Sequence, residues 1–184
     1  IKMDENPDIE GLRQAFMFSD RNANCFEYET TPYSKPSLWI KSIAIQNTTI
    51  TKKDKVVSIE FSPSLTTIIG GRGSGKSSIL RFLRGVFDRN SDINGLEEIL
   101  KEQLNFFKLC DNDGIGVLKA DSKIIVEFVR DEILYRITFV KSERERTIEK
   151  YNPESDSFDP VTDEFFIDFF EFEQYSQKQI FALA

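Results

Sequence analysis

The stretch IIGGRGSGKSS at residues 68–78 constrains the fold of this chain more than any other feature. Two β-branched residues lead into a turn with four glycines, which ends in Lys76, Ser77 and Ser78. Glycines tolerate positive φ angles, so successive backbone N–H groups can converge on one anion. Apolar residues at helical spacing follow over residues 77–87, and a helix there directs its unpaired N–H groups at the same point. The pattern predicts a strand, an anion-binding turn and a helix in succession.

The turn also fits the pattern G-x-x-x-x-G-K-[ST], known as the P-loop or Walker A motif. We therefore expect it to bind ATP together with Mg²⁺. In this pattern Lys76 supplies a positive charge to the β- and γ-phosphates, and the Ser77 hydroxyl is a ligand of Mg²⁺. The residues assigned to ATP are those of the whole turn: Gly70, Gly71, Arg72, Gly73, Ser74, Gly75, Lys76, Ser77 and Ser78.

Composition limits the partners and the chemistry. The 184 residues carry a net charge of −7, whereas a domain that grips nucleic acid with its whole surface usually has a basic excess. Any contact with DNA must then be local or made by other parts of an assembly. The absence of histidine excludes His-based zinc sites and Ser-His-Asp triads. Cys25 and Cys110 are expected to be reduced, partly buried thiols.

Targeting signals are also missing from the sequence. No apolar run approaches the roughly 20 residues that span a bilayer, and no signal peptide opens the chain. We expect a cytoplasmic protein with no membrane partner. The chain begins with Ile1 rather than methionine, so we expect it to be a fragment or a processed product.

Periodicity predicts two parts. Residues 1–38 are expected to form an N-terminal helix and an extended linker, and residues 39–184 the main domain. Alternating apolar residues predict strands at 38–47 and 55–61 with a turn between them, and residues 64–70 read as a short strand buried on both faces. A second amphipathic helix is expected over 93–109, with its apolar stripe formed by Leu96, Ile99, Leu100, Leu104 and Phe107.

Further antiparallel strands are expected over residues 114–141, with a tight connection at Asp131–Glu132. Residues 141–150 alternate in charge sign and are expected to form a solvated strand or loop. Residues 163–184 are expected to form a strand, a polar turn and the start of a helix. Arg81 and Arg84, on the helix after the turn, could contact DNA or a partner, but the simpler interpretation is that they solubilise the surface.

The segment LTTIIGGRGSGKSSILRFLRGVF, with the lead-in IEFSPS, resembles the Walker A region of the SMC/Rad50/RecF class of ABC ATPases. Two strands precede the P-loop strand, and residues 114–141 stand where those ATPase heads carry a β-subdomain. The resemblance implies an α/β fold with α+β character: a P-loop NTPase that is the N-terminal lobe of an ABC/Rad50-like head, with an antiparallel β-subdomain. The tail FEQYSQKQIFALA resembles the Q-loop of that class, which implies that Gln177, or else Gln174, reaches Mg²⁺ and the attacking water. Taken without the resemblance, Gln177 would be a solvated glutamine at a helix start.

A closer resemblance covers more of the chain. PDIEGLRQAF, an extended linker and IIGGRGSGKSSILRFLR are similar to the junction of TrlF-type proteins, in which a PHP-type phosphoesterase is joined to an SMC/Rad50-like ATPase. This implies that residues 1–38 are the edge of an upstream PHP-type domain, whose catalytic core lies outside this chain. No LSGGQ-like signature is present. EFFIDFF at 164–170 imitates a Walker B strand ending at Asp168, although a Phe-rich core segment is the simpler interpretation.

These features predict an ATP-binding lobe that works through ATP-gated dimerisation in a DNA-processing or defence assembly. Its partners would be a missing C-terminal ATPase lobe, a second head, a linked PHP-type phosphoesterase, and nucleic acid reached through the full assembly. Lys76 and Gln177 would be the catalytic residues, and the isolated chain would be a weak ATP hydrolase or inactive. The alternatives are a non-catalytic interaction module stabilised by nucleotide and a self-contained P-loop kinase with Asp168 or another acid as its base.

Overall fold

The computed structural model describes residues 2–3, 23–24, 35–142, 145–161 and 174–175. The chain divides into two compact units, residues 1–36 and 37–184. In the first unit, β1 (Lys2–Met3) pairs antiparallel with β2 (Ala23–Asn24). The helix predicted within residues 1–38 lies outside the described residues.

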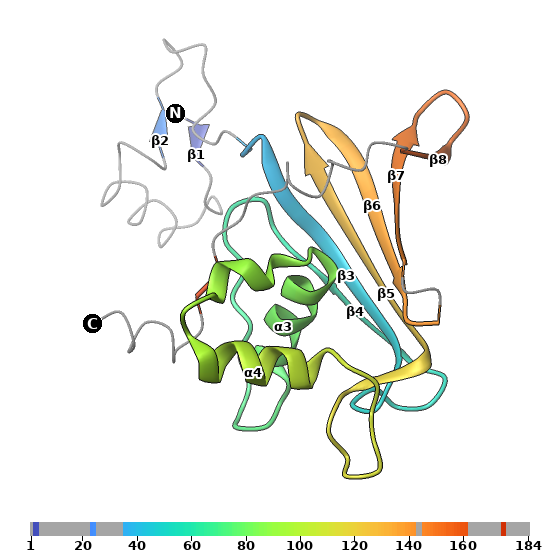
Figure 1. Ribbon diagram of the computed structural model, residues 1–184. Helices are drawn as coiled ribbons and strands as arrows, with labels where there is room; N and C mark the ends of the chain where they lie inside the picture. Colours follow the sequence, from blue (N-terminus) through green and yellow to red (C-terminus); the bar gives the residue numbers. More distant parts are fainter. Residues whose placement is uncertain (1, 4–22, 25–34, 143–144, 162–173, 176–184) are drawn as a thin grey trace. The chain divides into compact units, whose positions relative to one another are not determined.

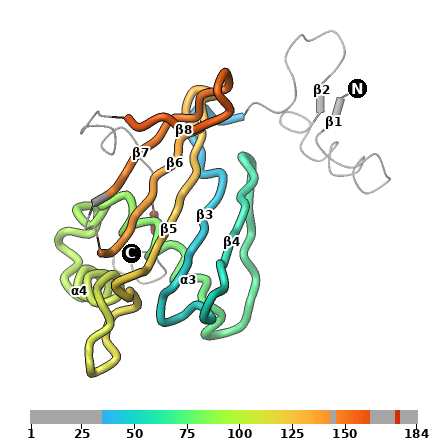
Figure 2. Tube along the Cα trace, turned by 90° about the vertical axis from the view of Figure 1, so that its right-hand side faces the viewer, coloured from blue at the N-terminus to red at the C-terminus, as the bar shows by residue number. Residues whose placement is uncertain are grey.

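The second unit is built on a six-stranded sheet with the order β4-β3-β5-β6-β7-β8. Figure 2 shows these strands side by side across the sheet. All neighbours pair antiparallel, as the sequence predicts for residues 38–61 and 114–141. The strands are β3 (Leu38–Thr48), β4 (Val56–Glu60), β5 (Leu118–Arg130), β6 (Ile133–Val140), β7 (Glu145–Asn152) and β8 (Ser157–Pro160).

The connection between β5 and β6 is the tight one expected from the sequence. Arg130 pairs with Ile133, and the two residues between them, Asp131 and Glu132, have φ angles of 49° and 66°. A two-residue hairpin with both central residues in the left-handed region is a type I′ turn, whose twist matches that of the strands it joins. The turn thereby fixes the register of the longest hairpin in the sheet.

The helices lie on one face of this sheet (Figure 1). In α3 (Lys76–Val86) the apolar residues Ile79, Phe82, Leu83 and Val86 recur at helical spacing and are buried. They pack against the alternate residues that β3, β5, β6 and β7 direct to this face. Burial of each such apolar side chain contributes about 1.5–3 kcal/mol to the free energy of folding. Those strand residues are Ile43, Ile45, Ile124, Val126, Phe128, Ile137, Phe139 and Ile148.

The second predicted helix is shorter than residues 93–109. A 3₁₀ turn (Arg89–Ile93) is followed by Gly95 at a φ angle of 93°, and α4 (Glu97–Phe106) can begin only after it. Leu96, Ile99, Leu100 and Phe107 of the expected stripe are half-buried. Leu104 is 52% exposed, which contradicts the prediction, while Gln103 is buried and donates from Nε2 to the carbonyl of Arg81 at 3.0 Å.

The strand predicted at residues 64–70 is wrong for the described structure. These residues adopt no regular secondary structure, and Leu65 and Ile69 are 81% and 89% exposed. A strand exists only where another strand takes up its backbone N–H and C=O groups. Within the described part of the chain no strand pairs with this segment, because β4 pairs on one side only, with β3.

The architecture therefore has α+β character. Among the described residues, named strands pair only antiparallel, and the parallel pairing present is the isolated bridge between Leu109 and Leu118. None of the helices described is both long enough and apolar enough to cross a membrane. Cys110 is free and exposed, which corrects the expectation of a partly buried thiol, and Cys25 lies outside the described residues.

Candidate nucleotide-binding site

The glycine-rich turn joins the exposed segment 65–69 to the first turn of α3. Gly75 stands immediately before the helix with φ 88° and ψ 4°, in the left-handed region where a side chain would be strained. At Gly70 an added Cβ would lie 2.5 Å from the Ser74 hydroxyl oxygen and 3.1 Å from the Ser74 Cβ, so the Ser74 side chain would have to shift to make room. Backbone conformation therefore requires glycine at position 75, whereas glycine at position 70 leaves room for the Ser74 side chain.

Backbone donors accumulate in this turn. Within the described part of the chain, no hydrogen bond uses the N–H groups of Gly73, Gly75, Lys76 or Ser77. The N–H of Ser74 is taken by the carbonyl of Gly71 at 3.3 Å. The first turn of α3 contains no acidic residue and its start has no side-chain cap. Unused donors and the positive end of the helix dipole are what an anion needs at such a position.

The Lys76 side chain folds back over the turn. Its Nζ donates to the carbonyl oxygens of Gly70 at 2.5 Å and Gly71 at 2.8 Å, and to the Ser74 hydroxyl at 3.3 Å. These acceptors are neutral and the contacts are exposed to solvent, so an anionic oxygen would be a stronger partner for the ammonium. Lys76 is therefore held at the mouth of the turn by bonds that it can exchange.

The remaining residues of the motif are accessible. Arg72 and Ser77 are exposed, and Ser78 is half-buried with its N–H on the carbonyl of Gly75 at 3.0 Å. Ser77 is the second residue of α3 and follows Lys76 directly. The structure thus brings together all the motif residues singled out in the sequence, from Gly70 to Ser78.

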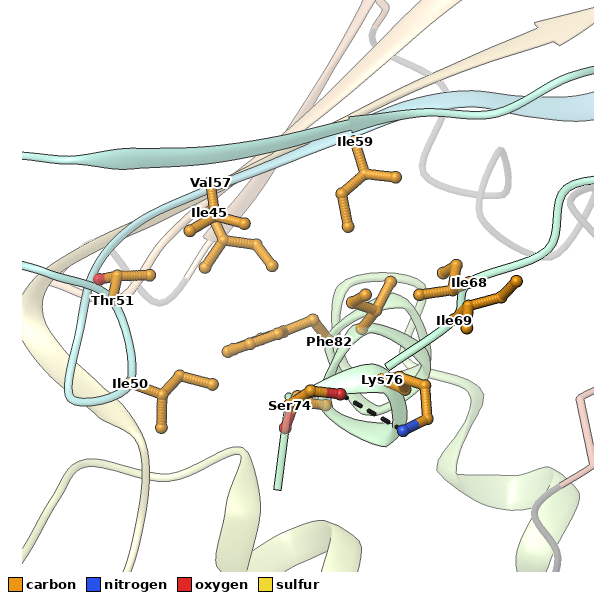
Figure 3. A pocket seen from close by; sticks show the side chains of 13 residues that line it. Ile45, Ile50, Thr51, Val57, Ile59, Ile68, Ile69, Ser74, Lys76 and Phe82 are labelled. Carbon is orange, nitrogen blue, oxygen red and sulfur yellow. Dashed lines mark hydrogen bonds between the residues drawn. The ribbon is translucent and has the colours of Figure 1, made fainter. Parts of the chain in front are cut away.

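A pocket of about 280 Å³ adjoins the turn (Figure 3). Ser74, Gly75, Lys76 and Ser78 line one end of it. Apart from Thr51, the rest is aliphatic or aromatic and comes from α3, from the segment before the turn, and from the hairpin of β3 and β4. The hairpin residues are Ile45, Ile50, Thr51, Val57 and Ile59. Sequence reasoning missed this wall, because alternating apolar residues in a strand do not show which face is left open.

Gln174 is placed at the other end of α3. Its carbonyl accepts from Arg84 Nη2 at 3.0 Å, while Arg84 Nη1 donates to the carbonyl of Arg89 at 3.3 Å. Arg84 comes eight residues after Lys76, so this anchor is about 12 Å further along the helix. Gln174 Oε1 is buried without a hydrogen-bond partner among the described residues. Gln177 and Asp168 lie outside the described residues.

Of the two helix arginines, Arg84 is buried and does not solubilise the surface as expected, whereas the Arg81 side chain is 36% exposed. Arg84 is 3% exposed, and burial lowers the pKa of its guanidinium, an effect that nearby Asp92 opposes. Arg81 pairs with Glu102 of α4 at 2.8 Å and lies over the ring of Phe106. Both side chains hold α3 to neighbouring segments. The sequence of the helix alone does not show these contacts, because their partners lie elsewhere in the chain.

A glycine-rich turn with free N–H groups, a lysine at its mouth and a helix directly behind it define a P-loop nucleotide-binding protein. The comparison of the sequence with known families agrees with this class. The AAA ATPase domain family matches residues 39–182, which is most of the chain, and the chain belongs to this family. No curated protein matched the sequence.

Proposed function

We propose that residues 70–78 bind the triphosphate of ATP with Mg²⁺, and that the chain acts as the N-terminal ATP-binding lobe of an SMC/Rad50-like ATPase head. The observation that carries the proposal is the turn itself. Four backbone N–H groups are unused within the described residues, and the Lys76 ammonium rests on two neutral carbonyls beside them. A triphosphate satisfies both kinds of donor at once.

Each motif residue has a distinct task in this proposal. Lys76 transfers its hydrogen bonds from the carbonyls of Gly70 and Gly71 to phosphate oxygens, and the N–H groups of the turn hold the same phosphates. The Ser77 hydroxyl binds Mg²⁺, and Gln177 is its second protein ligand. Among the described residues no group of three acidic or thiol side chains could hold a metal. Mg²⁺ is usually held by few protein ligands together with substrate phosphates.

The wider assembly is also part of the proposal. A C-terminal ATPase lobe and a second head would close over the nucleotide, so that ATP gates dimerisation. Residues 1–38 would be the edge of a linked PHP-type phosphoesterase, and nucleic acid would be reached through the full assembly. The net charge of −7 supports this division of tasks, since it disfavours nucleic-acid binding over the whole surface of the chain.

The first test is calorimetric titration of the full chain with ATP and Mg²⁺. Lys76→Ala should weaken ATP binding about 10- to 100-fold, because a charge-assisted hydrogen bond contributes about 1.5–3 kcal/mol. Lys101→Ala is a matched control: Lys101 is an exposed lysine of α4 and should leave binding unchanged. Equal ATP affinity in the wild-type chain and in Lys76→Ala would refute the proposal.

Turnover and sizing separate the alternatives. Lys76-dependent binding without turnover, with dimerisation on ATP, supports half of a split ATPase head. Binding without turnover or dimerisation supports a non-catalytic module that nucleotide stabilises. Rapid Lys76-dependent turnover by a monomer would instead indicate a complete enzyme, and Asp168 would then be the first residue to replace.

A further inference from the structure

The pocket beside the turn has two chemically different ends. At the turn, Lys76 and the serine hydroxyls are polar, whereas at the hairpin the walls are the aliphatic side chains of Ile45, Val57 and Ile59. In Figure 3 these three side chains project from the hairpin toward Phe82, with Ser74 and Lys76 at the opposite side of the opening. A ligand with a charged end and a flat, weakly polar end matches this division.

We propose that the aliphatic end of the pocket is the base subsite, and that it accepts purine bases without distinguishing adenine from guanine. This inference rests on the proposed binding of a triphosphate by the turn. The volume of about 280 Å³ lies at the lower limit of small-molecule pockets, which are on the order of 300–1,000 Å³. It suits a base, while the phosphates remain on the turn.

The hairpin end offers no side-chain group to read the base among the described residues that line it. Thr51 carries the single side-chain polar atom there, and that atom is engaged with Thr48. Thr51 Oγ1 accepts from the Thr48 N–H at 2.9 Å and donates to the Thr48 carbonyl at 3.2 Å. The unpaired backbone groups of the edge strand β4 lie in the plane of the sheet and not on the face that lines the pocket.

An apolar wall recognises a base by contact area and not by its pattern of donors and acceptors. Sites built to hydrogen-bond a substrate group reject analogues by about 10⁴–10⁵-fold, but an apolar pocket discriminates only weakly against a ligand of similar shape. Adenine and guanine differ mainly in their edge groups. We therefore expect ATP and GTP to bind with affinities within about tenfold of each other, and CTP to bind more weakly because its single ring buries less area.

Val57 and Val56 make a matched pair for the test. Val57 lines the pocket, whereas Val56, its neighbour in β4, does not. The two are similarly exposed, at 42% and 54%. Val57→Trp fills the base end and should weaken ATP and GTP binding about tenfold or more, which corresponds to about 1.4 kcal/mol. Val56→Trp should change neither affinity.

Inorganic tripolyphosphate serves as the ligand without a base. Its affinity should be the same in the wild-type chain and in Val57→Trp, which also shows that the turn is still folded. Ile50→Ala is the milder second variant, because Ile50 is 52% exposed and its removal leaves the strands intact. It should weaken ATP a few-fold and leave tripolyphosphate unchanged.

The outcomes are distinguishable. A preference of 10³-fold or more for ATP over GTP, or an unchanged ATP affinity in Val57→Trp, overturns the base subsite while leaving the triphosphate site standing. Tripolyphosphate binding that survives Lys76→Ala overturns the proposed function itself. Absence of nucleotide binding by the wild-type chain counts against both.

Discussion

Gly85 offers the sharpest test of the packing. It is the second-last residue of α3, and an added Cβ would lie 2.4–2.5 Å from three ring atoms of Phe107. That ring cannot withdraw easily, because its centroid is 5.0 Å from that of Phe139 and 6.5 Å from that of Phe82. Alanine should gain about 1 kcal/mol in helix propensity over glycine, while overpacking a closed core usually costs about 1–3 kcal/mol.

For a Cβ this close to a clamped ring the steric cost should exceed the gain. We expect Gly85→Ala to lose about 1–2 kcal/mol of unfolding free energy, which lowers Tm by about 2–8 °C for a chain of this size. Thermal unfolding followed by circular dichroism measures this shift. The double variant Gly85→Ala with Phe107→Leu removes the ring, and in that background alanine should become neutral or stabilising. A higher Tm for Gly85→Ala alone, or the same loss in both backgrounds, would refute the reasoning.

Two further predictions concern the sheet and the loop after α4. Arg146 donates from Nε to the Val86 carbonyl at 2.8 Å and from Nη2 to the Gly85 carbonyl at 3.0 Å, at the negative end of α3. Arg146→Met should therefore lower the free energy of unfolding, measured in urea, by about 1.5–3 kcal/mol. Arg146→Lys should recover only part of this loss, and full recovery would contradict the role given to the two hydrogen bonds by showing that the charge alone suffices. Asp111 accepts from the Ile115 N–H at 2.8 Å and from Lys108 at 3.2 Å, which hold the pKa of its carboxyl below the ordinary value. The stability that the lowered pKa of Asp111 adds is present above the unfolded-state pKa and is lost as the pH falls through the folded-state pKa. Asp111→Asn should therefore flatten the decline of stability below about pH 4. Identical acid unfolding of the wild-type chain and the variant would contradict this prediction.

Strands β3 to β6 and helix α3 were predictable because each depends on a local signal. Alternation over residues 38–61 and 114–141 gives the antiparallel strands, and the apolar spacing after Lys76 gives α3. The glycine-rich turn was predictable as a unit, because its glycines, lysine and serines are consecutive in the sequence.

The features that were predicted wrongly depend on contacts with distant parts of the chain, which a local sequence pattern does not indicate. Residues 64–70 have the β-branched composition of a strand, but composition cannot supply a neighbouring strand. Gly95 delays the start of α4, and near the other end of that helix Gln103 is buried while Leu104 is exposed. Arg84 is buried because two backbone carbonyls accept its hydrogen bonds, one of them contributed by Gln174, far along the chain.

The position of β3 in the sheet has a consequence for how the protein folds. β3 pairs with β4, which follows it directly, and with β5, which is reached only after the turn and both helices: Ile45 lies opposite Val57 on one side and Ile124 on the other. Pairing across so long a loop is slow, because chain entropy is lost before the contacts form. During synthesis the glycine-rich turn emerges well before β5, whose pairing with β3 completes the sheet behind it. ATP binding should therefore appear late in refolding, in step with this long-range pairing and not with the earlier formation of α3.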